Sequence, residues 1–296
     1  MVRRSKSHRR RRKAHHRSWW ASIDFRRHRR LFGNVAFVVL VLTFLVTGSI
    51  AVARLEAHVD NQLLDRFGPP AVTFINRPEQ LAELARDDLD KSVSDLLSRD
   101  WTDDRLCRDI ATRLESVGWV AGVNFVRRTA DARFEVGARY RLPVAMVQQA
   151  DEFLLVDRQG VRLPGTYLYD PAWKLIQGLG GVAPQAGAHW EGDDLDAALT
   201  IIAAVANEPY DDQITAVLVD NLGGRRDPLG CHLELATDRA GGRIRWGSAP
   251  GFELEENTVE QKLAILRENY RKTGRLDAHH PVIDISTFPD RFTIPE

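Results

Sequence analysis

An uncharged stretch of 23 residues, Leu31 to Ala53, constrains this chain more than any other feature of its sequence. At ~1.5 Å per residue a helix of this length reaches ~34 Å, which is enough to cross a hydrocarbon core of ~30 Å. The stretch also lacks the polar stripe that a helix in the core of a soluble protein normally shows. We therefore predict a transmembrane helix over residues 31–53.

Charge is distributed unevenly on the two sides of this stretch. Residues 1–30 carry thirteen Lys or Arg and one acid, whereas the rest of the chain has a net charge of −12. The positive-inside bias predicts a single-pass protein of the inner (plasma) membrane, with a basic arm (1–30) in the cytoplasm and the bulk in the periplasm. A cleavable signal peptide is the alternative, because residues 51–53 are Ala-Val-Ala, but the apolar stretch exceeds the usual ~7–15 residues.

The basic arm and the two cysteines each leave alternatives open. The arm either binds anionic lipid or nucleic acid or only enforces the topology, and the second role is the simpler one. Cys107 and Cys231 lie far apart in the sequence. A disulfide between them is compatible with an oxidising compartment, although nothing in the sequence brings them together. Their spacing excludes a zinc site built on cysteines.

Hydrophobic periodicity predicts a small α+β module after a connector over residues 54–70. A β-type run at 71–76 precedes two amphipathic helices, over 79–99 and 101–118, the second with Thr102 as N-cap and Gly118 as stop signal. Two strands, 123–128 and 133–147, follow as a hairpin. The expected order over 71–148 is therefore β-α-α-β-β, with the helices covering one face of the sheet.

The strand predicted over residues 133–147 begins with an alternation of apolar residues with polar residues or glycine, from Arg133 to Leu142. Phe134, Val136 and Ala138 share one parity, and Arg133, Arg139 and Arg141 share the other. Period two predicts one buried and one solvated face. We expect a free edge of this strand to template another chain, with the three arginines as a secondary surface for acidic partners. Alternatively, these arginines only keep the sheet soluble.

Residues 151–296 are predicted to form a second, mostly antiparallel β domain with two helices. Its second helix, 257–274, is followed by two short strands at the end of the chain. The expected elements are a hairpin over 152–164, a helix over 193–207, strands over 213–221, 231–238 and 242–247, the helix over 257–274, and strands over 281–286 and 291–295.

No catalytic motif is present in the sequence. There is no G-x-S-x-G, H-E-x-x-H, C-x-x-C or G-x-x-x-x-G-K-[ST]. We expect no catalytic residue, cofactor or metal, and we interpret Asp277, His279 and His280 as a solvated turn, because a zinc site needs three or four ligands. The alternative is a membrane-anchored envelope hydrolase with dispersed catalytic groups, which would show as a cleft with converging, perturbed titratable groups.

Three motifs occur in a characteristic order along the outer part of the chain. They are "GWVAGVNFVRR…RFEVGARYRLPVA", "FLLVDRQGVRLP" and "IRWG…EQKLAILRENY…PVIDIS". Together with the predicted anchor and element order, they resemble the bacterial cell-division protein family FtsQ, called DivIB in some lineages. Arg141, Pro143 and Ala145 match the family's Glu-Arg-x-Pro-x-Ala ending, while Tyr140 replaces its glutamate. The first strand, "VTFINRP", departs from the usual Val-x-Val-x-Gly. The likeness covers roughly residues 31–294.

The resemblance implies a non-enzymatic scaffold of the division machinery. It implies a POTRA domain, a polypeptide-binding module, over 71–148, and a β domain over 151–296 that docks single-pass coiled-coil partners of the FtsB and FtsL type. A transport-type POTRA protein would need an outer-membrane barrel, for which the second domain is too short. By resemblance, the partner site comprises Arg267, Tyr270, Ile283, Asp284, Ile285, Ser286, Phe292, Thr293 and Ile294. Within it we expect Ile283 and Ile285 to face inward and Asp284 and Ser286 outward.

Overall fold

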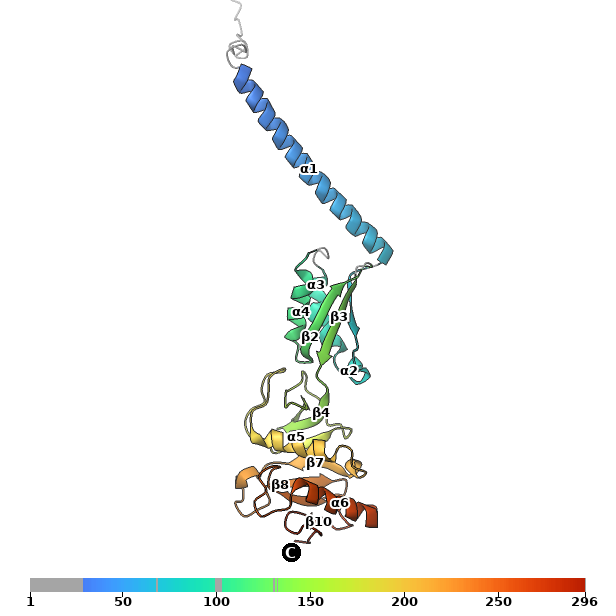
Figure 1. Ribbon diagram of the computed structural model, residues 1–296, viewed down its shortest axis with the longest axis vertical. Helices are drawn as coiled ribbons and strands as arrows, with labels where there is room; N and C mark the ends of the chain where they lie inside the picture. Colours follow the sequence, from blue (N-terminus) through green and yellow to red (C-terminus); the bar gives the residue numbers. More distant parts are fainter. Residues whose placement is uncertain (1–28, 68, 99–102, 130, 132, 296) are drawn as a thin grey trace, which may run out of the picture. The chain divides into compact units, whose positions relative to one another are not determined.

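The computed structural model describes residues 29–67, 69–98, 103–129, 131 and 133–295. Within these residues the protein is mixed α+β, with six α-helices and two β-sheets (Figure 1). The chain divides into two units, one that ends at Arg66 and a compact one from Phe67 to Glu296. The predicted α+β class is confirmed at this level.

The first unit contains one long helix, α1 (Arg29–Phe67). Its segment Asn34–Leu55 is long and apolar enough to cross a membrane, and no other helix among the described residues is. The segment predicted as a connector is helical up to Phe67, because no glycine or proline interrupts it before Gly68-Pro69-Pro70. Residues 1–28 of the predicted basic arm lie outside the described residues.

The second unit begins with a three-stranded sheet. Its strands are β1 (Ala71–Ile75), β2 (Val120–Arg128) and β3 (Arg133–Tyr140), in the order β1-β3-β2. The central strand β3 runs parallel to β1 and antiparallel to β2. It therefore has a neighbour on both sides, and the predicted free edge on this strand is wrong.

Three helices lie between β1 and β2, where two were predicted. They are α2 (Glu79–Leu84), α3 (Arg86–Leu97) and α4 (Leu106–Glu115), and Figure 1 shows α3 and α4 on one side of the sheet. The helix predicted over 79–99 is interrupted at Ala85, whose φ of −110° and ψ of −2° depart from helical values. This turn directs Leu81, Ala85 and Leu89 into one core, where all three are fully buried.

The predicted ends of the second helix differ from the observed ones. Thr102, the predicted N-cap, lies outside the described residues. Helix α4 ends at Glu115, so Gly118 is not its stop signal. A Cβ atom at Gly118 would lie 2.8 Å from the backbone nitrogen of Gly187, so this glycine instead permits close contact between two backbones.

The long strand predicted over 133–147 is two strands that belong to different sheets. After β3, residues 141 and 142 lead into β4 (Pro143–Gln149), which pairs in the second sheet. Arg141 lies at this change of sheet. Its Nη1 donates to Oδ2 of Asp157 at 2.8 Å, and its backbone N–H donates to the carbonyl of Trp119 at 2.9 Å. The alternation of β3 does not continue into β4, whose residues 143–147 are all apolar.

The second sheet has seven strands in the order β10-β9-β8-β7-β6-β4-β5. The pairs β4–β6, β6–β7 and β9–β10 are parallel and the other three are antiparallel, so the prediction of a mostly antiparallel sheet is wrong. Its remaining strands are β5 (Glu152–Asp157), β6 (Lys174–Gln177), β7 (Ile214–Leu218), β8 (Leu233–Thr237), β9 (Arg243–Gly247) and β10 (Val282–Asp284).

Helices explain two of the parallel pairs. Parallel neighbours need a crossover connection, which α5 (Asp193–Val205) supplies between β6 and β7 and α6 (Val259–Thr273) supplies between β9 and β10. Strand β6 escaped prediction because it is only four residues long. Two short 3₁₀ helices, Asp211–Gln213 and Leu222–Gly224, lie in the connections that flank β7.

Both faces of the larger sheet contribute to hydrophobic cores. Helices α5 and α6 cover one face, where Trp246 and Leu235 are buried. On the opposite face Met146, Leu155 and Leu175 belong to the same cluster as the core of the smaller sheet. The two sheets are therefore joined by continuous apolar packing within the compact unit.

We expect Gly178→Ala to destabilise the larger sheet by about 3 kcal/mol, since strain and overpacking add there. Gly178 has a φ of +86°, and a Cβ atom would lie 2.7 Å from the backbone nitrogen and Cα of Asp220. Gly181 is the matched control, because its φ is +79° but nothing lies within 4 Å of a Cβ there. Gly181→Ala should cost only about 1 kcal/mol. Urea unfolding of both variants tests this, and equal losses would contradict it.

Candidate functional site

The predicted partner residues lie on helix α6 and on the segment from β10 to residue 294. Helix α6 starts with a capping box between Thr258 and Gln261 and ends at Gly274, which is left-handed with a φ of 74°. Strand β10 follows as the last strand of the sheet and runs parallel to β9. The helix predicted over 257–274 is confirmed.

The end of the chain lies along the outer side of β10. The backbone N–H of Asp284 donates to the carbonyl of Thr293, and the N–H of Thr293 donates to the carbonyl of Asp284, both at 2.8 Å. Residues 291–295, which we call the tail, are therefore the outermost main chain at this end of the sheet. Neighbouring residues of an extended chain direct their main-chain groups to opposite sides. Those of Phe292 and Ile294 consequently point away from β10.

Burial separates core residues from accessible residues in the predicted site. Ile283 and Ile285 are fully buried, which confirms the predicted parity. Asp284 and Ser286 are partly exposed, and Oδ1 of Asp284 accepts hydrogen bonds from the N–H and the Oγ of Ser286 at 2.8 and 2.6 Å. Ile294 is 55% exposed, whereas Phe292 is half-buried with its ring 5.6 Å from that of His280.

Arg267 and Tyr270, the two residues of the predicted site on α6, contact the connection before β7. Arg267 is exposed and binds the carboxylate of Glu208 through Nε and Nη2, at 2.8 and 2.6 Å. These hydrogen bonds lower the pKa of Glu208. Tyr270 is half-buried, with its ring 6.0 Å from that of Tyr210. Arg267 and Tyr270 are therefore engaged with the connection before β7, and the tail provides the more accessible part of the predicted site.

The three arginines of the predicted secondary surface differ in exposure. Arg133 is exposed and lies 3.4 Å from Asp131, and Arg139 is exposed beside Gly122. The side chain of Arg141 is only 17% exposed and is paired with Asp157, so it is not the solvated residue that was predicted. Arg141 lies beyond the end of β3, where the chain passes into the larger sheet, so the alternation of β3 does not decide its exposure.

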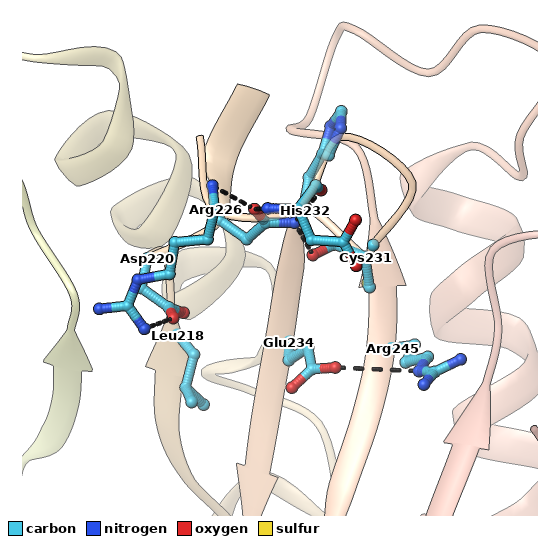
Figure 2. Close-up of a pocket in the computed structure, with 10 residues that line it drawn as sticks. Leu218, Asp220, Arg226, Cys231, His232, Glu234 and Arg245 are labelled. Carbon is cyan, nitrogen blue, oxygen red and sulfur yellow. Dashed lines mark hydrogen bonds and ion pairs between the residues drawn. The ribbon is translucent and has the colours of Figure 1, made fainter. Parts of the chain in front are cut away.

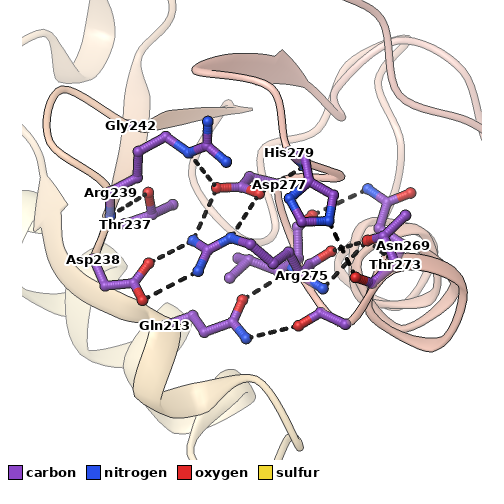
Figure 3. A network of polar contacts seen from close by, with 12 residues as sticks. Gln213, Thr237, Asp238, Arg239, Gly242, Asn269, Thr273, Arg275, Asp277 and His279 are labelled. Carbon is purple, nitrogen blue, oxygen red and sulfur yellow. Dashed lines mark hydrogen bonds and ion pairs between the residues drawn. The ribbon is translucent and has the colours of Figure 1, made fainter.

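A polar network fastens the end of α6 to the hairpin of β8 and β9 (Figure 3). Arg275 donates two hydrogen bonds to Asp238, at 3.2 and 2.5 Å, and two to Asp277, at 3.1 and 3.0 Å. Arg239 also lies 3.4 Å from Asp277. The bonds from Arg275 lower the pKa of Asp238. At Asp277 burial raises the pKa, but the bonds from Arg275 and the N–H of His279 outweigh it and the net shift is downward.

This network corrects the prediction of a solvated turn. Asp277 is 1% exposed, whereas His279 is exposed and adopts a left-handed φ of 68°. The network could not be predicted from the sequence, because Asp238 and Arg239 lie far from Arg275 and Asp277 in the chain. The part of the chain that the structure describes contains no group of three or more His, Cys, Asp or Glu that could hold a metal ion.

A cavity of about 260 Å³ lies beside β8 (Figure 2). Two of its three acids are in ion pairs, Asp220 with Arg226 at 2.5 Å and Glu234 with Arg245 at 3.9 Å. The third, Asp227, accepts from the backbone N–H of Leu229 at 3.1 Å. Burial raises the pKa of Cys231 to about 11, so its thiol is neutral at pH 7. The residues that line the cavity are Leu218, Asp220, Asn221, Arg226, Asp227, Gly230, Cys231, His232, Glu234 and Arg245.

The chemistry of this cavity differs from that of a nucleophilic active site. A reactive cysteine needs a lowered pKa and a partner that accepts its proton. The Sγ of Cys231 instead donates to the carbonyl of Leu233 at 2.9 Å. Cys107 and Cys231 are both free thiols, so the cysteine pair considered from the sequence is not formed. No sequence motif pointed to this cavity.

No protein-family model matches the chain, and no curated protein matches it in sequence.

Proposed function

We propose that this protein is a non-enzymatic, membrane-anchored scaffold that binds other membrane proteins through the outer edge of the tail. The observation that carries the proposal is the antiparallel bridge between Asp284 and Thr293. It makes the tail a sheet edge whose outward main-chain groups are accessible. Such an edge pairs with an added strand of another chain, which gains main-chain hydrogen bonds.

The exposure of the tail supports this role. No described residue forms a hydrogen bond with the main chain of Phe292 or Ile294. The opposite edge strand, β5, is bridged by the chain that follows it, at Phe153–Tyr167 and Val156–Arg162. Of the two edges of the larger sheet, the tail is thus the better template.

The element order supports the family proposal made from the motifs. One strand, helices on one face and two further strands, with β3 in the centre, are compatible with a POTRA-type module. We propose that the protein acts in division as a member of the FtsQ and DivIB type. Its partners would then be single-pass coiled-coil proteins of the FtsB and FtsL type, met on the periplasmic side of the inner membrane.

The anchor adds a physical advantage to this scheme. Confining the compact unit to a membrane surface raises its effective concentration for partners anchored in the same membrane. Modest strand-to-strand contacts then suffice for assembly. In the alternative of an anchored hydrolase, the cavity beside β8 would have to supply the catalytic groups. The ion pairs of Asp220 and Glu234 and the neutral thiol of Cys231 argue against that role.

We expect Ile294→Pro to weaken partner binding at least ten-fold. Proline removes the outward N–H of residue 294, and the bridge between Asp284 and Thr293 does not use that group. Ile285 is unsuitable for this test, because it is fully buried and its N–H donates to the carbonyl of Arg245 at 3.2 Å. Binding is measured by crosslinking full-length protein in membranes of the source cells and quantifying the single-pass proteins recovered.

Ile294→Ala is the matched control, since it removes the same exposed side chain but keeps the N–H. We expect it to lower recovery less than two-fold. Equal loss in both variants would assign binding to the side chain and not to strand addition. Undiminished recovery of the same proteins with Ile294→Pro, in a folded variant, would reject the tail as the docking edge.

A further inference from the structure

The loop between β9 and α6, residues 248–257, exposes large apolar side chains. Phe252 is 72% exposed and Leu254 is 86% exposed, and Phe288, in the turn after β10, is 40% exposed. Single exposed apolar residues are ordinary on protein surfaces. Phe252 and Leu254 are separated by one position, and Asn257 joins their loop to the segment that bears Phe288. Exposed large apolar side chains gathered on adjoining segments are of the kind that marks an interaction site.

An ion pair between the partly exposed Glu256 and the buried Lys262 holds the base of this loop. Oε2 of Glu256 accepts from the N–H of Ser248 at 2.9 Å and from Nζ of Lys262 at 3.3 Å, while Oε1 accepts from Oγ of Ser248 at 3.0 Å. The side chain of Lys262 is fully buried. A Cβ atom at Gly247 would lie 2.3 Å from Oε2 of Glu256, so the carboxylate packs directly on the backbone. Both ends of the loop are thus fixed by one side chain.

Asn257 fastens the loop to the segment that bears Phe288. Its backbone N–H donates to the carbonyl of Ser286 at 2.7 Å. Its Nδ2 donates to the carbonyls of Ile285 and Phe288, at 2.7 and 2.6 Å. Because Asn257 is only 3% exposed, these bonds are shielded from water. The apolar side chains of the two segments are therefore presented from a shared, fixed base.

Charge indicates which partner this surface accepts. Glu253 and Glu255 flank Leu254 in the sequence. Oε2 of Glu253 accepts from the N–H of Gly251 at 2.8 Å, but its Oε1 is shielded from water without a hydrogen-bond donor among the described residues. These acids would repel an anionic lipid surface and attract a cationic protein segment. Arg291 is already engaged, with its guanidinium 4.8 Å from the centre of the Phe288 ring.

We propose that Phe252, Leu254 and Phe288 form a docking surface for a cationic amphipathic segment of a partner protein. The apolar side chains would pack against its apolar face, and Glu253 and Glu255 would pair with lysines or arginines at its border. This apolar loop surface is distinct from the tail edge, which binds through main-chain groups. It does not depend on the proposed role in division.

Photo-crosslinking tests the surface in the full-length protein. A benzophenone amino acid replaces Phe252, irradiation is done in membranes of the source cells, and the crosslinked peptide is sequenced by mass spectrometry. Leu229, which is 99% exposed on a different loop, is the matched control position. We expect an adduct from position 252, and not from 229, with a net positive amphipathic peptide. A lipid adduct, an acidic or uncharged peptide, or the absence of an adduct would overturn the proposal.

Charge reversal provides the second arm of the test. Glu253→Lys combined with Glu255→Lys should reduce the yield of that adduct at least ten-fold. Glu152 is exposed at the start of β5, so Glu152→Lys combined with Asp151→Lys makes the same change in net charge elsewhere and should leave the yield unchanged. Equal yields from both double variants would overturn the proposal. Ile294→Pro should retain the adduct, which separates failure of this surface from failure of the tail edge.

Discussion

Asp157→Ala is expected to destabilise the compact unit by about 3–5 kcal/mol. The Asp157 carboxylate is 5% exposed and pairs with the largely buried Arg141 at 2.8 Å. It also accepts from the backbone N–H groups of Gln159 and Val161, at 2.8 and 2.9 Å. Alanine removes the anionic partner of a shielded guanidinium, which keeps only Gln159 Oε1 at 3.2 Å among the described residues, and the acceptor of two amides. The loss falls where the chain passes from one sheet to the other.

Urea unfolding of the detergent-solubilised full chain, followed by tryptophan fluorescence, measures this loss. Trp119 is fully buried at the junction of the sheets and reports on the same region. Asp131→Ala is the matched control, because its partner Arg133 is exposed, and we expect little change there. Similar unfolding midpoints for the two variants would show that the Arg141–Asp157 pair does not fasten the sheets.

Arg275→Ala is expected to cost about 3–5 kcal/mol, because it leaves Asp277 buried with much of its compensation removed. Asp277 is 1% exposed and would keep only Arg239, at 3.4 Å, and the N–H of His279, at 2.9 Å. Arg271→Ala breaks a comparable two-bond pair with Glu268, but both side chains are exposed there, and little change is expected. Equal effects in urea unfolding would contradict the importance of burial.

The effect of Arg275→Ala should depend on pH in a defined direction. In the folded protein the pKa values of Asp238 and Asp277 are lowered from the ordinary value of 3.8. The stabilisation is then present above the unfolded pKa and is lost as the pH falls through the folded pKa. The difference in unfolding free energy between wild type and variant should be largest near pH 7 and shrink below about pH 4. A difference that does not change with pH would rule out this linkage.

Local patterns in the sequence predicted the individual elements well. The uncharged stretch predicted the apolar helix, and the segment 257–274 predicted α6. Alternation predicted that Ile283 and Ile285 are core residues. These features depend on neighbours within a few residues, so the sequence alone suffices for them. The bridge from the tail to Asp284 could not be read from any local pattern.

The sequence by itself determined that the protein has one long apolar helix and an α+β remainder with α6 and β10 near its end. The tertiary structure was needed to show that residues 133–149 form strands of two different sheets and that three strand pairs of the larger sheet are parallel. It was also needed to show that Arg141 binds Asp157 and is not solvated. The physical reason is that strand pairing and ion pairing join residues far apart in the chain, whereas period and capping depend only on local geometry.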